Sequence, residues 1–450
     1  MNTEETPVNP GLRTWFSESV LVKLVLIGML SLFLLIPSVA IQDLINERQE
    51  RQKEVIAEVS DKWAGAQVLG GPVMVLPYKR SISQRDSAGR QSFKEMVSNV
   101  YILPETLEAH AKTSPTVLKR GIFDVIVYSS KIRVNGKFSG LELKKSGINP
   151  DLILWNKARV AIGLTDLKGL KNNPVIRLGD SSYTVEPDFT SLKLFGNNLI
   201  ISPDLSVKKN PALNFSFELD LNGSENLSFM HMGRDTRVLV EGDWKNPSFS
   251  GRYLPETRSV TDGKFSASWT MPHFNRPLPQ QWMEENNVPD TLSADQTFGV
   301  KFLVPVDDYQ KTMRSAKYAI LIILLTFISL FFTELITKRK VHLLQYVLIG
   351  SAMIIYYTLL LSFTEQFGFN LAYLVASAAT VVLITSFLAS LLNNRKTTLI
   401  FGGILTAFYS FIFVIIQLQD LALLFGSVGL FVIIAIMMYL SSKLDWSRRL

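Results

Sequence analysis

Residues 20–41 read VLVKLVLIGMLSLFLLIPSVAI, and this run is long enough to cross a membrane. It contains a single charged residue, Lys23, close to its start. A helix that spans the hydrocarbon core of a bilayer needs about 20 predominantly apolar residues. A lysine near one end of such a helix can extend its ammonium group to the lipid headgroups. The run therefore predicts a membrane-spanning helix over residues 20–41.

A cleaved signal peptide is the alternative explanation for this run. Ser38-x-Ala40 fits a signal-peptidase site. The apolar stretch is nevertheless longer than the roughly 7–15 residues of a signal-peptide core. We therefore expect the helix to remain in the protein as an anchor.

Five further apolar runs of spanning length occur in the last third of the chain. They are nearly free of charge and are joined by short loops: residues 318–336, 341–363, 371–392, 399–416 and 421–440. A soluble helical core rarely contains five such runs. We predict one N-terminal membrane helix, a large polar insert, and a five-helix membrane bundle over residues 318–442.

The Lys and Arg residues of the short loops predict the orientation of these helices. Residues 338–340, residues 395–396 and the tail 443–450 are basic, whereas the alternate loops at 364–370 and 417–420 contain no Lys or Arg. Because basic loops are retained in the cytoplasm, residues 1–19 and 443–450 are expected there and the insert outside. Three basic residues after the first helix oppose this orientation, but acidic residues are interleaved with them: Arg48, Arg51 and Lys53.

The insert, residues 42–317, is predicted to be a periplasmic β-rich domain that begins with a helix. Residues 42–63 have apolar positions at helical spacing, which predicts an amphipathic stalk that packs on its own domain or on a partner. After Trp63 the apolar period becomes two, which is typical of strands. Eight strand-like runs follow, at 73–76, 100–103, 123–128, 131–134, 159–162, 214–221, 237–240 and 265–269.

The predicted strands are separated by dipeptides that favour tight turns, namely Asn135-Gly136, Asn222-Gly223 and Asp262-Gly263. We expect a sandwich of two antiparallel sheets. The length of the insert leaves open whether it forms one lobe or two. The predicted fold class is thus membrane α plus soluble β, with six transmembrane helices and a large, sandwich-like, mostly-β extracytoplasmic domain.

Composition excludes several classes of function. The 450 residues include no Cys, so disulfides, thiolate catalysis and Cys-ligated metals are ruled out. The net charge of +7 is compatible with a nucleic-acid partner. Residues 42–314, however, carry 35 Lys and Arg against 32 Asp and Glu, without the clustering that nucleic-acid binding needs. We predict no nucleic-acid partner.

The sequence shows no catalytic or cofactor-binding motif. The four His residues do not form a paired metal-ligand motif, and no nucleophile elbow, Walker A motif or dinucleotide fingerprint occurs. An acid–base pair of carboxylates without a local motif stays possible. We predict no metal, no cofactor and no enzymatic activity.

Two small groups of residues are candidates for function. In the membrane part they are Glu334, His342 and Tyr356, with Glu334 expected to pair with Lys338 or His342 or to couple protons. In the insert, Trp244, Trp269 and Arg276 are candidates for a stacking surface that binds a sugar or peptide. The alternative for the second group is a buried aromatic corner that holds two sheets together.

Three long motifs resemble those of a known family. They are WAGAQVLGGPVMVLPY at 63–78, GDWKNPSFSGRYLPETRSVTDGKFSASWTMPHFNRPLPQQW at 242–282, and FGVKFLVPVDDYQKTMRSAKYAILIILLTFISLFFTE at 298–334. Over nearly its whole length the chain is similar to the CreD family of bacterial inner-membrane, cell-envelope-integrity proteins. The resemblance implies a role in envelope integrity and stress response, with altered tolerance of colicins or cell-wall antibiotics. It implies no known catalytic activity and no functional residues.

Together these features predict a non-enzymatic inner-membrane protein. Its periplasmic β domain would bind an unknown envelope component or a membrane protein, and its helices would contact membrane lipids. The alternative is a transporter or lipid-handling protein that uses the five-helix bundle. A membrane-anchored hydrolase is a third possibility.

Overall fold

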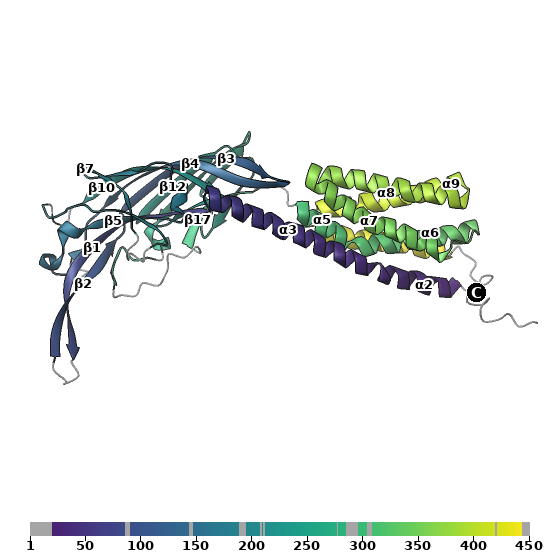
Figure 1. The fold of residues 1–450 in the computed structure, drawn as a ribbon, viewed down its shortest axis with the longest axis horizontal. Coiled ribbons are helices and arrows are strands. Elements are labelled where there is room, and N and C mark those ends of the chain that lie inside the picture. The colour runs from purple at the N-terminus through teal and green to yellow at the C-terminus, as the bar shows by residue number, and fades with distance from the viewer. Residues whose placement is uncertain are drawn as a thin grey trace, which may run out of the picture. The chain divides into compact units, whose positions relative to one another are not determined.

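The computed structural model describes residues 20–85, 91–143, 147–188, 195–207, 209, 212–276, 278–284, 296–303, 308–418 and 421–442. The predicted cytoplasmic segments 1–19 and 443–450 lie outside these residues. The chain divides into two compact units. The helical unit contains residues 1–52 and 306–450, and the β unit contains residues 53–305 (Figure 1).

The described part of the chain begins with two helices that nearly form one rod, and the division between the two units falls within the second helix. They are α2 (Val20–Phe33) and α3 (Leu35–Trp63), interrupted at Leu34. The helix thus continues through the predicted stalk, because charged residues follow the apolar run without a Gly or Pro that would end it. The helical unit also contains α5 (Asp308–Lys317), α6 (Ala319–Thr337), α7 (Leu343–Phe367), α8 (Phe369–Leu392), α9 (Arg395–Gln417) and α10 (Ala422–Ser442).

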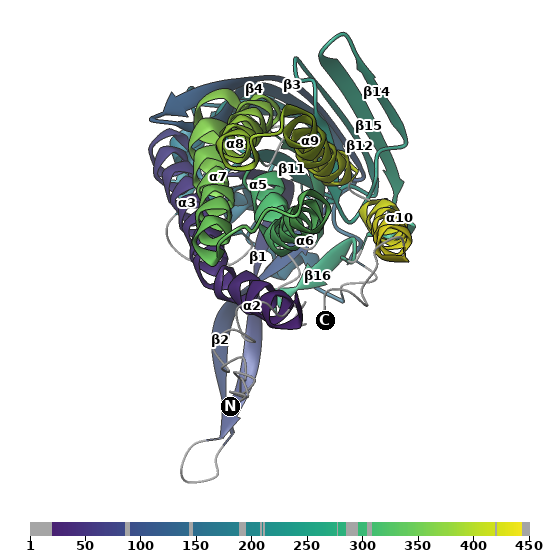
Figure 2. The same cartoon turned by 90° about the vertical axis from the view of Figure 1, so that its right-hand side faces the viewer.

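Six helical stretches in the described part of the chain are long and apolar enough to cross a membrane, one N-terminal and five C-terminal. This arrangement confirms the predicted fold class. The ends of α6 to α10 differ from the predicted ends by no more than four residues. Helices α7, α8 and α9 pack in succession, α6 packs on α7 and α9, and α10 lies to one side against α9 (Figure 2). The sequence analysis did not predict α5, which packs among the other helices of this unit.

The β unit contains seventeen strands among its described residues. The long ones are β1 (Gln67–Arg85), β2 (Gln91–Ile102), β3 (Thr106–Arg120), β4 (Phe123–Phe138), β10 (Leu213–Ser224), β12 (Asp235–Gly242) and β15 (Lys264–Pro272). The shorter ones are β5 (Arg159–Leu164), β6 (Val175–Leu178), β7 (Ser181–Thr184), β8 (Glu186–Asp188), β9 (Asn198–Ile201), β11 (Asn226–Met230), β13 (Pro247–Gly251), β14 (Thr257–Thr261), β16 (Gln281–Met283) and β17 (Thr297–Phe302). All eight predicted runs lie in or at the end of a strand, although 123–128 and 131–134 are parts of one strand, β4.

These strands form two sheets. The nine-stranded sheet has the order β13-β17-β11-β1-β5-β9-β8, with β2 beside β1 and β16 beside β2. The eight-stranded sheet has the order β14-β15-β12-β3-β4-β10-β6-β7. Each sheet contains a parallel pair, β1 with β11 and β3 with β12. Every other strand pair among the described residues is antiparallel, so the predicted antiparallel pairing is correct except at these two pairs, where long connections bring distant strands together in the same direction.

The two sheets pack face to face over one hydrophobic core. Trp269 of the eight-stranded sheet lies 5.6 Å from Phe298 of the nine-stranded sheet, measured between ring centroids. Tyr128 and Phe302 make a second contact of this kind at 5.2 Å. Buried residues from both sheets belong to this single cluster. The β unit is therefore one sandwich-like body in the described residues.

One of the three predicted turns occurs where it was expected. Asp262 and Gly263 join β14 to β15 with φ values of 53° and 77°, as a tight hairpin requires. Asn135-Gly136 lies inside β4 instead, and Asn222-Gly223 lies inside β10. A side chain at Gly136 would meet the Thr106 carbonyl oxygen at 2.2 Å from its Cβ. This glycine thus permits a close approach between strands rather than a turn.

Candidate functional site

The outer face of the eight-stranded sheet is polar. Along β3 and β4 the side chains alternate between buried and exposed, because successive residues of a strand point to opposite faces. The buried set faces the core, and the exposed set carries most of the charge. This alternation brings together residues that are far apart in the sequence on neighbouring strands.

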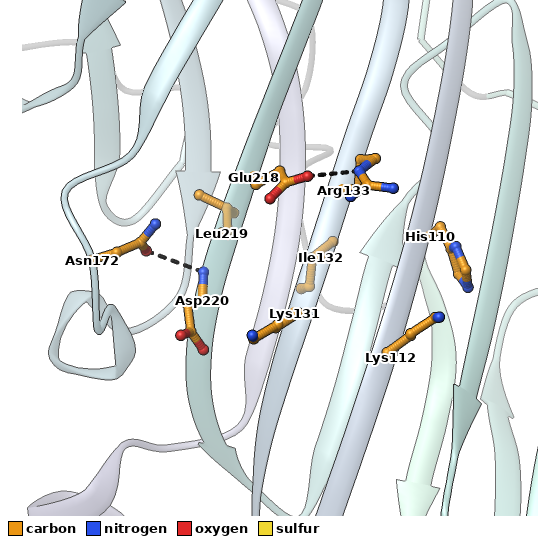
Figure 3. A pocket seen from close by; sticks show the side chains of 9 residues that line it. All are labelled: His110, Lys112, Lys131, Ile132, Arg133, Asn172, Glu218, Leu219 and Asp220. Atoms are coloured by element: carbon orange, nitrogen blue, oxygen red, sulfur yellow. Dashed lines mark hydrogen bonds and ion pairs between the residues drawn. The ribbon is translucent and has the colours of Figure 1, made fainter.

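A pocket of about 350 Å³ lies on this face, over β3, β4 and β10. Its lining residues are shown in Figure 3: His110, Lys112, Lys131, Ile132, Arg133, Asn172, Glu218, Leu219 and Asp220. Asn172 lies in a loop at one side, where its Oδ1 accepts a hydrogen bond from the Asp220 backbone N–H at 3.1 Å. The pocket thus combines three cationic side chains with two carboxylates.

Two polar contacts within the sheet engage side chains at the pocket. The Arg133 Nε lies 2.7 Å from the Glu218 Oε1, and the His110 Nε2 lies 2.8 Å from the Glu241 Oε2. Each pair joins side chains on neighbouring or near-neighbouring strands. The other two cationic side chains of the pocket are Lys112 and Lys131.

Lys112 and Lys131 are opposite each other in the register of β3 and β4. Like charges directly opposite on two antiparallel strands destabilise the pair. Within the described residues, no ion pair joins either lysine to an acid, although Asp220 is the register partner of Lys131 on β10 and Glu241 is that of Lys112 on β12. The pocket therefore presents two ammonium groups that can bind an anionic group.

The predicted aromatic surface is largely a packing corner. Trp269 is only 1% exposed and its Nε1 donates to the Tyr253 carbonyl oxygen at 3.0 Å. Trp244 is half-buried, donates to the Leu303 carbonyl oxygen at 3.2 Å, and packs edge-on against Phe302. The Trp269 ring is not accessible to a ligand. A binding role for these residues stays a prediction.

Arg276 joins its own segment, up to Gln280, to the segment at Met232. Its guanidinium donates to the carbonyl oxygens of Leu278 and Met232, both at 2.9 Å, and to the Gln280 Oε1 at 2.8 Å. Burial lowers the pKa of the guanidinium to about 10, and the nearby charge of Arg234 acts in the same direction. Because its N–H groups donate these hydrogen bonds, Arg276 stabilises the fold at this position.

His231 directly follows the last residue of β11. It is 3% exposed and packs edge-on against the Tyr253 ring, with centroids 6.0 Å apart. Burial lowers its pKa to about 4, and the Arg276 charge adds to this effect, while a weaker backbone contact with Gly233 opposes it. The imidazole is therefore neutral at neutral pH.

The membrane candidate Glu334 pairs with a residue that sequence analysis did not select. It forms an ion pair with Lys23 of α2 and accepts a hydrogen bond from the Tyr346 hydroxyl at 3.4 Å. Lys23 also donates to the Val341 carbonyl oxygen at 2.7 Å. The single charge inside the run 20–41 was the signal for this contact, but the partner lies too far along the chain to be inferred locally.

The other two membrane candidates, His342 and Tyr356, lie in different environments. His342 is exposed and forms the N-cap of α7, where its backbone N–H donates to the Gln345 Oε1 at 2.8 Å. Tyr356 is fully buried and belongs to a cluster of four tyrosines. Its ring centroid lies 4.8, 6.0 and 4.9 Å from those of Tyr357, Tyr373 and Tyr409.

A groove of about 540 Å³ lies between α8 and α9, beside this tyrosine cluster. Most of its lining is apolar or small, and Tyr373 and Tyr409 connect it to the cluster. The lining residues are Asn370, Tyr373, Leu374, Ser377, Ala378, Val381, Val382, Thr406, Tyr409, Ser410, Phe413 and Val414.

The fold defines a class of multi-spanning membrane proteins with a large β unit inserted after the first span. The family model described as inner membrane protein CreD matches residues 19–447, so the chain belongs to the CreD family and is an inner-membrane protein. A relative, inner membrane protein CreD of Escherichia coli (strain K12), is 28% identical over 415 residues, which is 92% of this chain and 91% of the relative.

Among solved structures, an M1 zinc metallopeptidase from Deinococcus radiodurans is similar over 38% of this chain and 39% of its own. The identity is 9% and the TM-score 0.17. A likeness of this size carries no argument about fold or activity.

Proposed function

We propose that this protein acts non-enzymatically in cell-envelope integrity and stress response. In this proposal the β unit lies in the periplasm and binds an envelope component that carries an anionic group. Membership of the CreD family and the basic loops on one side of the helices support the location. The observation that carries the binding role is the opposed pair Lys112 and Lys131 in the pocket on the polar sheet face.

The physical basis is the relief of repulsion. The two lysines are opposite in register, and Figure 3 shows the Lys131 ammonium on the side of Asp220 and the Lys112 ammonium on the side of His110. An anionic group that contacts both ammonium groups would offset the repulsion between these like charges. A pocket of about 350 Å³ is at the lower end of the range of roughly 300–1,000 Å³ for small-molecule sites. It has room for a phosphate or carboxylate together with a neighbouring group of a larger envelope component.

The lining of the pocket favours binding over hydrolysis. His110 and Glu241 form a contact like that between the base and the orienting acid of a hydrolase. Such a pair acts on a Ser, Thr or Cys nucleophile. None of the nine lining residues is of these types. The His110–Glu241 pair therefore supports a role in fixing the wall of the site.

Complementation tests the proposal. A strain that lacks the protein and shows altered tolerance of a cell-wall antibiotic would receive the double variant Lys112→Glu/Lys131→Glu. We expect this variant to fail to restore tolerance although it accumulates normally. The control Lys137→Glu/Lys264→Glu makes the same change of charge on the same sheet face, outside the pocket, and should restore it. Equal complementation by both variants would reject the pocket, and hydrolysis of an envelope component by the purified protein would reject the non-enzymatic role.

The alternative, a lipid-handling protein, also has a specific observation in its favour. The groove between α8 and α9 opens on exposed positions of membrane helices, and most of its wall is apolar. An apolar molecule of the bilayer can enter such a groove without leaving the hydrocarbon phase.

A further inference from the structure

We propose that the groove between α8 and α9 binds one acyl chain of an anionic phospholipid, whose phosphate contacts Lys311. This inference deepens the lipid-handling alternative, and it does not require a ligand at the β unit. Three observations carry it: the periodicity of the groove, its length, and the charge at one of its ends.

The groove is formed by one face of each helix. On α8 its lining residues recur at intervals of three and four positions from Asn370 to Val382, and on α9 they do so from Thr406 to Val414. Residues at this spacing share one side of a helix. Small side chains at Ala378 and Ser410 leave the space between the helices unfilled. The groove therefore runs parallel to the helices, which is also the direction in which an acyl chain extends through a leaflet.

The length of the groove corresponds to one leaflet. Twelve residues separate Asn370 from Val382, which is about 18 Å along a helix. Half of the hydrocarbon core is about 15 Å thick. The groove begins at the first turn of α8 and ends near the middle of the helix. It thus covers the depth of a single acyl chain, on the side predicted to be periplasmic.

The end of the groove at Asn370 carries a positive charge. The Gln417 amide donates to the Asn370 Oδ1 at 2.6 Å, and the Lys311 ammonium donates to the Gln417 Oε1 at 3.1 Å. Lys311 also lies 5.7 Å from the centre of the Phe369 ring. These contacts hold the ammonium group at the level where a lipid phosphate would lie above an acyl chain in the groove.

Two carboxylates lie on the helices around Lys311: Asp308, one turn earlier on α5, and Glu365, near the end of α7 and engaged by other residues. The Glu365 Oε1 accepts from the Tyr309 hydroxyl at 3.1 Å and lies 3.8 Å from the Arg48 Nε. Each basic residue near a membrane surface favours an anionic lipid by about fivefold in affinity. Charge complementarity therefore favours an anionic headgroup over a zwitterionic one.

Native mass spectrometry of the full chain, released from detergent and titrated with dioleoyl phosphatidylglycerol or dioleoyl phosphatidylcholine, tests the assignment. We expect the wild type to retain one lipid and to prefer phosphatidylglycerol about fivefold. Ala378→Phe should lose the retained lipid, because the ring fills the groove. Ala379→Phe, an exposed neighbour outside the lining, should keep it. If Ala378→Phe does not fold, Ser410→Leu fills the groove from α9.

Equal retention by the Ala378→Phe and Ala379→Phe variants would overturn the groove as the site. Lys311→Gln should abolish the headgroup preference, whereas Lys317→Gln should preserve it. An unchanged preference in Lys311→Gln would overturn the headgroup contact. Lys112→Glu/Lys131→Glu should retain the lipid as the wild type does, so failure of the lipid site and failure of the β-unit site are distinguishable.

Discussion

Lys23 of α2 and Glu334 of α6 form an ion pair inside the helical unit, although 311 residues separate them in the sequence. Their side chains are 27% and 12% exposed. The Lys23 ammonium also lies 5.8 Å from the centre of the Tyr346 ring of α7. A single lysine thus connects the N-terminal helix to two helices of the C-terminal bundle.

Removal of one partner of this pair should destabilise the helical unit. We expect Glu334→Gln to lower the free energy of unfolding by about 2 kcal/mol, less than the roughly 3–5 kcal/mol for a fully buried pair, because Lys23 is partly exposed. The double variant Lys23→Met/Glu334→Met should recover much of the loss. Thermal unfolding in detergent measures both. Strictly additive effects of Lys23→Met and Glu334→Met, each measured alone and then together, would show that the pair makes no coupled contribution.

Trp269 and Trp244 should differ in their effect on stability. Trp269 is buried between the two sheets, so Trp269→Ala should lower the unfolding free energy by about 3–5 kcal/mol. Trp244→Ala should lower it by less, because that ring is only half-buried. Chemical denaturation followed by circular dichroism gives the two values. A large loss of antibiotic tolerance in a Trp244→Ala variant of normal stability would support the predicted binding role of this surface.

The stability of the β unit should fall in acid because of His231. Its folded-state pKa of about 4 lies below the ordinary value of 6.5, so the unfolded chain binds more protons between these values. Stability is therefore complete above about pH 7 and should decline by about 3 kcal/mol as the pH falls to 4. His231→Phe should remove this part of the decline. Urea unfolding at pH 7.5 and pH 4, followed by tryptophan fluorescence, compares them, and identical pH dependence would contradict the assignment.

The absence of Cys permits a direct test of the orientation. Ser259→Cys places a single thiol on an exposed strand of the β unit, and Arg339→Cys places one in the basic loop between α6 and α7. In intact spheroplasts, a maleimide that does not cross membranes should label Ser259→Cys only. After permeabilisation it should label both. Labelling of Arg339→Cys in intact spheroplasts would reverse the proposed topology.

The apolar runs were predictable because a membrane imposes one requirement, a long uncharged helix, that residues satisfy independently of their distant neighbours. Strand positions were also predictable from local alternation. The predicted turns at Asn135-Gly136 and Asn222-Gly223 were wrong, because strand pairing overrides a local preference. The first dipeptide pairs with β3 and β10, and the second pairs with β4. At Gly223 the Tyr128 hydroxyl would meet an added Cβ at 2.3 Å, so this glycine is required by packing.

The candidate site was less predictable than the fold. Lys131 lies in the predicted run 131–134, whereas Lys112 lies in β3, which the sequence analysis did not predict. Neither segment has a motif. Their opposition depends on the register of β3 and β4, which the sequence pattern does not determine. The partner of Glu334 was missed for the same reason, because a contact across 311 residues leaves no local signal. The aromatic corner, in contrast, agrees with the alternative that the sequence itself offered for Trp269.

The central claim is that the pocket over Lys112 and Lys131 binds an anionic envelope component. In vivo photo-crosslinking from position 172, which lines the pocket without supplying its charge, tests it most directly. The account predicts an adduct with an envelope component from position 172 and not from position 259, and its loss in the Lys112→Glu/Lys131→Glu background. An adduct that persists after this reversal of charge, or that forms equally from position 259, would contradict the account.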